Sequence, residues 1–382
     1  MKKALAILMI FALVASVAVA EVSVGAWGRG FFVPVANGGG KGENGTGLAT
    51  SWGTAPRIGF TVAGNSDNVG FQVDINADGA FGSNVKADQT KTVYTDVGNY
   101  LTFGDQQKIW VKPIDMMTVQ IGKIFDDTLR GNGCFGSFDW IRLSWTGEDF
   151  TFTRVIAQAG AEIAVQPMDA LYAYVAFDAL PNFTQNAFSD MQVGAGYTIE
   201  GIGQIRAQYL GAIATYDTKG LADKTYGTIE VAFKVAAVEN LYADIGFKMS
   251  TDDKYGMKKE KDINLYANYK VSGATLHVLA GLALNKVYNG DEKMGIELGF
   301  GADYGLEGGI GLAADVRYKN DVAAGSKDGM VGFFAGATKG FSNGLIGVGV
   351  EVSTTTFAPE IIPADDAKEM SWAIPVRLEY WF

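Results

Sequence analysis

Apolar and polar residues alternate one by one along most of the chain. In residues 263–269, Asn264, Tyr266 and Asn268 stand between apolar neighbours, and residues 69–76 and 228–235 alternate in the same way. A period of two is typical of β-strands with one apolar and one polar face. After residue 20 no segment keeps a helical period, and no run of about 18 apolar residues could form a membrane-spanning helix.

The links between the expected strands are alternately short and long. The short links are turns rich in Gly, Asn, Asp and Ser, typical of β-hairpins, and the long links are polar and charged. An opening strand at 22–32, a closing strand at 372–382 and eight hairpins give 18 strands. The predicted hairpins are 56–64/68–77, 105–112/116–124, 160–166/170–178, 190–199/203–213, 225–237/241–250, 262–271/274–285, 293–304/309–318 and 329–338/344–354.

The strand count stays open at one place. Residues 138–157 look like a ninth hairpin, which would give 20 strands, and a count of 16 is also compatible with the uncertainty of strand boundaries. All three numbers are even, as single-chain bacterial barrels require.

The apolar faces have two alternative partners. In a soluble sandwich they would pack against a second sheet, whereas in a transmembrane barrel they would face lipid. Short turns at one end and long loops at the other are typical of outer-membrane barrels, and a tilted spanning strand needs about 9–11 residues. The sequence therefore predicts an all-β fold: one closed, transmembrane, antiparallel β-barrel over residues 21–382, with about 18 strands and a range of 16–20.

The first twenty residues have the pattern of a secretory signal peptide. Lys2 and Lys3 precede an apolar stretch that ends in Ala18-Val19-Ala20. A retained membrane anchor is the alternative, which the short apolar stretch disfavours. Removal of the two lysines changes the formal charge from -11 to -13, and this acidic balance argues against nucleic-acid partners.

The residues needed for catalysis or metal binding are scarce. The chain has one His and one Cys, so it cannot form an intramolecular disulfide or a cysteine-built zinc site. His277 is expected to face the barrel interior, but no serine motif or paired acid can be tied to it from the sequence. We therefore expect no enzyme activity, no cofactor and no metal site.

The chain ends on a strand whose apolar residues share one face. Leu378, Tyr380 and the terminal Phe382 share this face with Trp372, Ile374 and Val376, and this segment resembles the closing strand of porin-type bacterial outer-membrane β-barrel proteins. The resemblance implies export to the cell outer membrane, contact with outer-membrane lipid, and recognition of this terminal signal by the barrel assembly machinery. It also implies passive diffusion of ions and small hydrophilic solutes, and a homotrimer by analogy only.

Residues 120–123 resemble, more loosely, the end of the strand that precedes the constriction loop in general porins. The resemblance implies that residues 124–137 fold into the pore, where Asp126, Asp127 and Arg130 would line the constriction. The alternative is an ordinary external loop with a solvated acidic pair, and we favour it because loops are generally charged. Cys134 lies in the same segment, as a free thiol without a partner in this chain.

Charged residues at inward positions of the expected strands are nearly balanced in sign. Eleven are acidic: Asp74, Glu162, Asp178, Glu230, Asp244, Asp262, Glu297, Asp303, Asp315, Glu351 and Glu379. Nine are basic: Arg57, Lys108, Lys112, Arg206, Lys234, Lys248, Lys270, Arg317 and Arg377. Of these, Arg57, Lys108, Lys112 and Arg206 are our candidates for residues that line the pore.

These features favour a weakly cation-selective diffusion pore. The alternative is a barrel that acts as an adhesin or receptor through its long surface loops. Aromatic residues near strand ends are expected in the girdles at the two membrane interfaces: Trp27, Tyr269, Tyr318, Trp372 and Tyr380.

Overall fold

The structure is a computed structural model that describes most of the strands and the short turns. The described residues are 21–37, 45–48, 57–76, 102–130, 152–153, 155–177, 191–212, 226–251, 261–288, 291–320, 329–354 and 370–382. The predicted signal peptide, residues 1–20, and Cys134 lie outside them.

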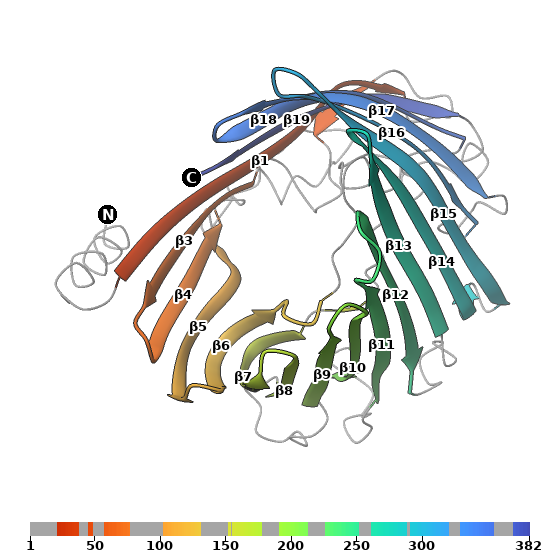
Figure 1. The fold of residues 1–382 in the computed structure, drawn as a ribbon. Helices are drawn as coiled ribbons and strands as arrows, with labels where there is room; N and C mark the ends of the chain where they lie inside the picture. The colour runs from red at the N-terminus through yellow and green to blue at the C-terminus, as the bar shows by residue number, and fades with distance from the viewer. Residues whose placement is uncertain are drawn as a thin grey trace, which may run out of the picture.

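The described residues form nineteen strands and one sheet (Figure 1). The strands are β1 (Glu21–Asn37), β2 (Gly45–Leu48), β3 (Arg57–Asn65), β4 (Val69–Asn76), β5 (Thr102–Ile114), β6 (Met117–Asp126), β7 (Val155–Met168), β8 (Leu171–Phe177), β9 (Met191–Ile199), β10 (Gly203–Ala212), β11 (Tyr226–Val235), β12 (Leu241–Ser250), β13 (Lys261–Val271), β14 (Ala274–Tyr288), β15 (Asp291–Leu306), β16 (Ile310–Lys319), β17 (Met330–Phe341), β18 (Gly344–Ser353) and β19 (Ser371–Trp381).

The sheet closes on itself to form a barrel. From β3 onward each strand pairs antiparallel with the next, and β1 pairs with β3 on one side and with β19 on the other, through partners such as Trp27 and Trp381. The short β2 pairs only with the far end of β1, from Phe32 to Ala36. Without β2, eighteen described strands close the barrel, which confirms the predicted fold and number.

The possible ninth hairpin does not enter the barrel sheet. β6 pairs directly with β7, where Gln120 faces Glu162, so no further hairpin lies between these two strands in the sheet. Residues 155–157 of the predicted hairpin belong to β7. Of its remaining residues, only Phe152 and Thr153 are described.

The two faces of the barrel differ in chemistry. Large apolar side chains point outward and stay exposed, for example Val24 (59%), Ile109 (61%) and Phe300 (56%). Polar and charged side chains such as Glu230 and Asp244 point inward and are buried. This is the division expected of a barrel surrounded by lipid. Within the described ranges, no helix is long and apolar enough to cross a membrane.

The short turns are tight because a few residues adopt positive φ. In the turn between β11 and β12, Asn240 has φ 62°, and in the turn between β13 and β14, Ser272 and Gly273 have φ 47° and 83°. Gly and Asn tolerate this backbone region best, which is why such residues mark hairpin turns in the sequence.

One aromatic assignment is wrong. Trp27 points to the inner face, where it lines a cavity together with Arg29 and Asp74, and therefore cannot belong to an outer aromatic girdle. Tyr269 and Tyr318 are 44% and 36% exposed, as expected for side chains on the outer face.

Candidate functional site

The connection from β6 to β7 begins against the inner face of the barrel. Asp126, the last residue of β6, accepts a hydrogen bond of 2.5 Å from the Tyr172 hydroxyl of β8. Its other carboxylate oxygen accepts hydrogen bonds from the Thr128 amide (2.8 Å) and hydroxyl (2.6 Å). The turn that leaves β6 is therefore fixed by a side chain of the interior wall.

Leu129 continues this contact across to β9 and β10. Its side chain is 3% exposed, and its carbonyl oxygen accepts a hydrogen bond of 3.0 Å from Arg206 Nη1. Gly196 makes room for it, because a Cβ at position 196 would lie 2.5 Å from Leu129 Cδ2. The Arg206 guanidinium is itself paired with Asp244 of β12 and lies 5.1 Å from the centre of the Phe152 ring.

The same connection returns to the wall at Thr153. Its amide and hydroxyl donate to the two carboxylate oxygens of Glu230, at 2.8 and 2.6 Å. Its carbonyl accepts from Gln208 Nε2 at 2.8 Å, and its hydroxyl accepts from Lys248 Nζ at 3.0 Å. Four hydrogen bonds to β10, β11 and β12 therefore hold this one residue inside the barrel.

The described ends of the connection thus lie inside the barrel, 126–130 at one end and 152–153 at the other. These contacts do not fit the external loop that we favoured from the sequence. The described ends lie on the inner wall of β8–β12, and residues 131–151 between them lie outside the described part of the chain, so a constriction at this connection stays a prediction. The loose resemblance of residues 120–123 implied an inward segment, but the individual contacts could not be predicted, because the partners lie about 50 to 95 residues away.

The predicted pore residues occupy different environments. Asp127 is 55% exposed and forms a 3.5 Å pair with Arg130, which is 19% exposed. Lys108 is half-buried on the inner face of β5, and Lys112 is exposed with Nζ 5.7 Å from the centre of the Trp110 ring. Arg57 begins β3, where only its backbone is described.

Arg206 differs from the other candidates because only 1% of it is exposed. It is engaged with Leu129 and Asp244, so its guanidinium fixes the β6–β7 connection to the wall. Whether any of these residues contacts a permeating solute stays a prediction.

Further ion pairs lie along the inner wall. Arg317 lies 3.2 Å from Asp315, Lys319 lies 2.6 Å from Glu297, and Arg29 lies 2.8 Å from Glu379. Arg29 and Lys319 are absent from the nine bases predicted from the sequence. Alternation from Arg317 would have found Lys319, whereas Arg29 shares the register of Trp27, which the sequence assigned to an outer girdle.

His277 has a partner that sequence reasoning missed. Its Nε2 lies 2.5 Å from Asp303 Oδ2, and its Nδ1 lies 2.8 Å from the Tyr266 hydroxyl. Both ring nitrogens are engaged and the residue is 3% exposed. The imidazole is therefore a hydrogen-bonded wall residue without access for a substrate.

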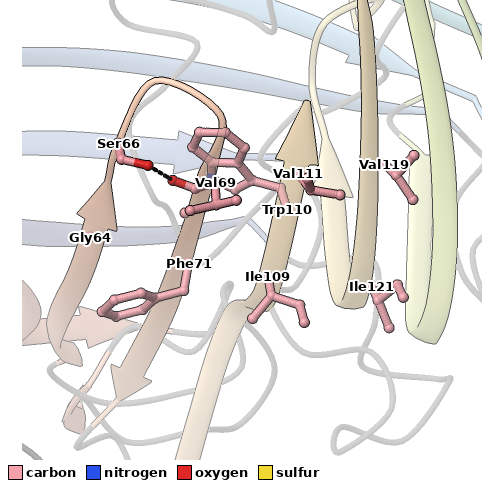
Figure 2. A pocket seen from close by; sticks show the side chains of 10 residues that line it. Gly64, Ser66, Val69, Phe71, Ile109, Trp110, Val111, Val119 and Ile121 are labelled. Carbon is pink, nitrogen blue, oxygen red and sulfur yellow. Dashed lines mark hydrogen bonds between the residues drawn. The ribbon is translucent and has the colours of Figure 1, made fainter. Parts of the chain in front are cut away.

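An apolar groove of about 420 Å³ lies elsewhere, on the outer side of β3–β6 (Figure 2). Figure 2 shows Phe71, Ile109, Val119 and Ile121 lining it, with the Ser66 hydroxyl donating to the Val69 carbonyl at 3.1 Å. Such a groove belongs to the lipid-facing surface and is separate from the polar interior.

A closed, even-stranded antiparallel barrel with an apolar exterior and a charged interior is the architecture of outer-membrane β-barrels. The chain is correspondingly similar to solved porin structures. OccAB4 of Acinetobacter baumannii matches with a TM-score of 0.57 at 10% identity, over 95% of this chain and 98% of that one. A BenF-like porin of Pseudomonas fluorescens Pf-5 matches with a TM-score of 0.57 at 13% identity, over 95% and 98%.

OccK9 (OpdG) of Pseudomonas aeruginosa matches with a TM-score of 0.58 at 10% identity, over 95% of this chain and 98% of that one. No protein-family model matches the sequence, and no curated protein matches it. At these identities the similarity concerns the fold, which is that of porin-type outer-membrane barrels.

Proposed function

We propose that the protein is a channel of the bacterial outer membrane, through which ions and small hydrophilic solutes diffuse. One observation carries the proposal. The described ends of the β6–β7 connection are fixed on the inner wall of a closed barrel, by Asp126, Leu129 and Thr153. An inward segment narrows a barrel of this size, whose interior would otherwise be too wide for its side chains to fill.

The chemistry of the two faces supports the same function. The apolar exterior suits lipid, and the inner wall offers charges of both signs at which hydrated ions can exchange water. The sequence places eleven acids and nine bases on that wall, and the structure adds the bases Arg29 and Lys319. Because the two signs are then nearly balanced, we propose that any preference for cations is weak.

Planar-bilayer recording of the purified, refolded protein tests the proposal. We expect stepwise conductance that persists over a range of voltages and rises with salt concentration, as in an aqueous pore. Protein whose folding is verified by a heat-dependent shift in gel mobility, but which stays silent in repeated recordings, would contradict it.

A receptor or adhesin with a filled interior is the second candidate. It is favoured by the burial of wall charges, since Arg206, Arg317 and Glu351 are each at most 1% exposed. In that case the folded protein would give no conductance steps but would still bind a partner.

A further inference from the structure

A polar cavity lies on the inner wall of β1, β3, β4 and β5, separate from the anchors of the β6–β7 connection. Its volume is about 340 Å³, which is enough for a small organic solute. The residues that line it are Trp27, Arg29, Thr61, Gln72, Asp74, Asn76 and Asp105.

A glycine places Trp27, the one aromatic residue among the described lining residues. Trp27 faces Gly59 in the β1–β3 register, and a Cβ at position 59 would lie 2.3 Å from Trp27 Cε2. The indole therefore lies directly over the Gly59 backbone. In this position it forms a flat apolar surface at the side of an otherwise polar cavity.

A β-bulge places one of the acids. Phe103 pairs with Ile75 and Gln107 with Val73, so residues 104–106 of β5 stand opposite the single residue Asp74. The Gln106 amide donates to Asp74 at 2.9 Å, and Asp105 is left exposed at the cavity. Bulges commonly redirect side chains in this way next to binding sites.

The lining offers hydrogen-bond donors and acceptors, and it holds charges of both signs. Asp74 accepts from the Thr61 hydroxyl at 2.8 Å and from Gln72 Nε2 at 3.1 Å, while Arg29 is tied to Glu379. In this cavity a cation would lie close to the like charge of Arg29, and an anion would lie close to the like charges of Asp74 and Asp105. A neutral ligand with several hydroxyl groups avoids both repulsions, and each hydroxyl can both donate and accept a hydrogen bond.

We propose that this cavity is a binding subsite for a neutral polyhydroxylated solute of the monosaccharide class. The C–H face of the sugar ring lies against the Trp27 indole, and its hydroxyls bond to Asp105, Asn76 and the remaining acceptor positions of Asp74. The inference rests on the proposed channel function and names a class of solute for it.

Glucose tests the subsite through two separate measurements. In bilayers, glucose should reduce the conductance of the wild-type channel saturably, beyond the viscosity effect of triethylene glycol at equal concentration. In detergent, saturation-transfer NMR should detect glucose bound to the folded protein whether or not it conducts. Trp27→Ala should raise the half-saturating glucose concentration about fivefold or more in both measurements.

Trp110→Ala is the matched control. Trp110 also lies over a glycine, since a Cβ at Gly70 would lie 2.4 Å from its Cε2, but it does not line the cavity. Its glucose response should equal that of the wild type. If Trp27→Ala does not fold, Asp105→Asn decides, because Asp105 is exposed; it should also weaken glucose binding.

Failure of the inference is distinct from failure of the channel. Conductance without saturable glucose binding, or equal binding by the Trp27 and Trp110 variants, would overturn the subsite and leave the channel intact. Saturation by glycine betaine in place of glucose would overturn it in favour of a zwitterion site. Glucose binding by a protein that does not conduct would support the subsite alone.

Discussion

The buried charges of the inner wall owe their stability to specific partners. Arg206 and Asp244 are both about 1% exposed or less and are bonded to each other. Removing two such charges from water is costly, and only their mutual attraction and added hydrogen bonds compensate. The Leu129 carbonyl and the Tyr242 hydroxyl, 3.3 Å from Asp244, supply such bonds.

Asp244→Asn should therefore destabilise the barrel. The change leaves the Arg206 charge buried without its carboxylate, which typically costs about 3–5 kcal/mol. We expect a lower midpoint of urea unfolding in detergent, followed by tryptophan fluorescence. Asp127→Asn is the control, since its 3.5 Å pair with Arg130 is exposed and such pairs contribute about 0–1 kcal/mol. Equal midpoints for the two variants would show that the buried pair adds no stability.

At single positions, the sequence predicts the direction of a side chain better than its partner. Asp74, Glu230 and Asp244 were assigned to the interior by alternation alone, and they lie there. The partners could not be predicted, because Thr153 meets Glu230 from 77 residues away. Trp27 was misplaced because an aromatic residue near a strand end suits a membrane interface, and only the glycine opposite it indicates the inner face.

Among the elements, the hairpins were predictable and the segments inside the barrel were not. A hairpin is specified locally, by two alternating strands and a turn such as 272–273. The direction of the β6–β7 connection depends instead on contacts with β8–β12. Residues 138–157 stayed open as a possible ninth hairpin because alternation indicates one polar and one apolar environment, without showing which element provides them.

Thr153→Val should loosen the β6–β7 connection. The variant keeps the shape of the side chain but loses the hydroxyl that donates to Glu230 and accepts from Lys248. We expect open-channel current noise to rise while the barrel still folds. Thr198→Val is the control, because Thr198 is exposed near the end of β9. Identical noise in both variants would contradict an anchoring role for Thr153.

The closing strand carries a separate prediction about assembly. In β19, Leu378 and Tyr380 point outward, and the following Phe382 is 78% exposed while its amide donates to the Ala26 carbonyl at 2.8 Å. If the assembly machinery recognises this face, Phe382→Ser should reduce the folded protein in outer-membrane fractions severalfold. Phe357→Ser, in a predicted loop outside the described residues, should not. Equal yields of the two folded variants would contradict an assembly signal at Phe382.

For the whole molecule, the pattern of residues defines the fold more strongly than their identity. The chain shares the porin fold with structures at 10% to 13% identity. A closed barrel needs only alternating faces, strands of sufficient length and turns that link them, because closure itself satisfies the backbone hydrogen bonds. Alternation therefore predicted the barrel, while the arrangement inside it depends on contacts between distant parts of the chain.

Ion selectivity is a property of the whole molecule for which the net charge and the charge of the inner wall lead to different expectations. Without its first twenty residues the chain has a formal charge of -13, which alone would suggest a strong cation preference. Many of these acids lie in predicted loops, and a Debye length of about 8 Å at physiological salt limits their effect on the pore. On the wall, eleven acids stand against the nine predicted bases and the two further bases Arg29 and Lys319, so any preference should be weak.

Reversal potentials under a salt gradient measure this preference directly. We expect weak cation selectivity that fades as salt rises, because screening shortens the range of every charge in water. Asp127→Asn should reduce the cation selectivity further, since this carboxylate is 55% exposed. Asp126→Asn is less suitable because Asp126 is bonded to Tyr172 and Thr128, so the change would also disturb the turn. Strong anion selectivity would contradict the wall assignment, whereas an unchanged reversal potential in Asp127→Asn would place that residue away from the ion path.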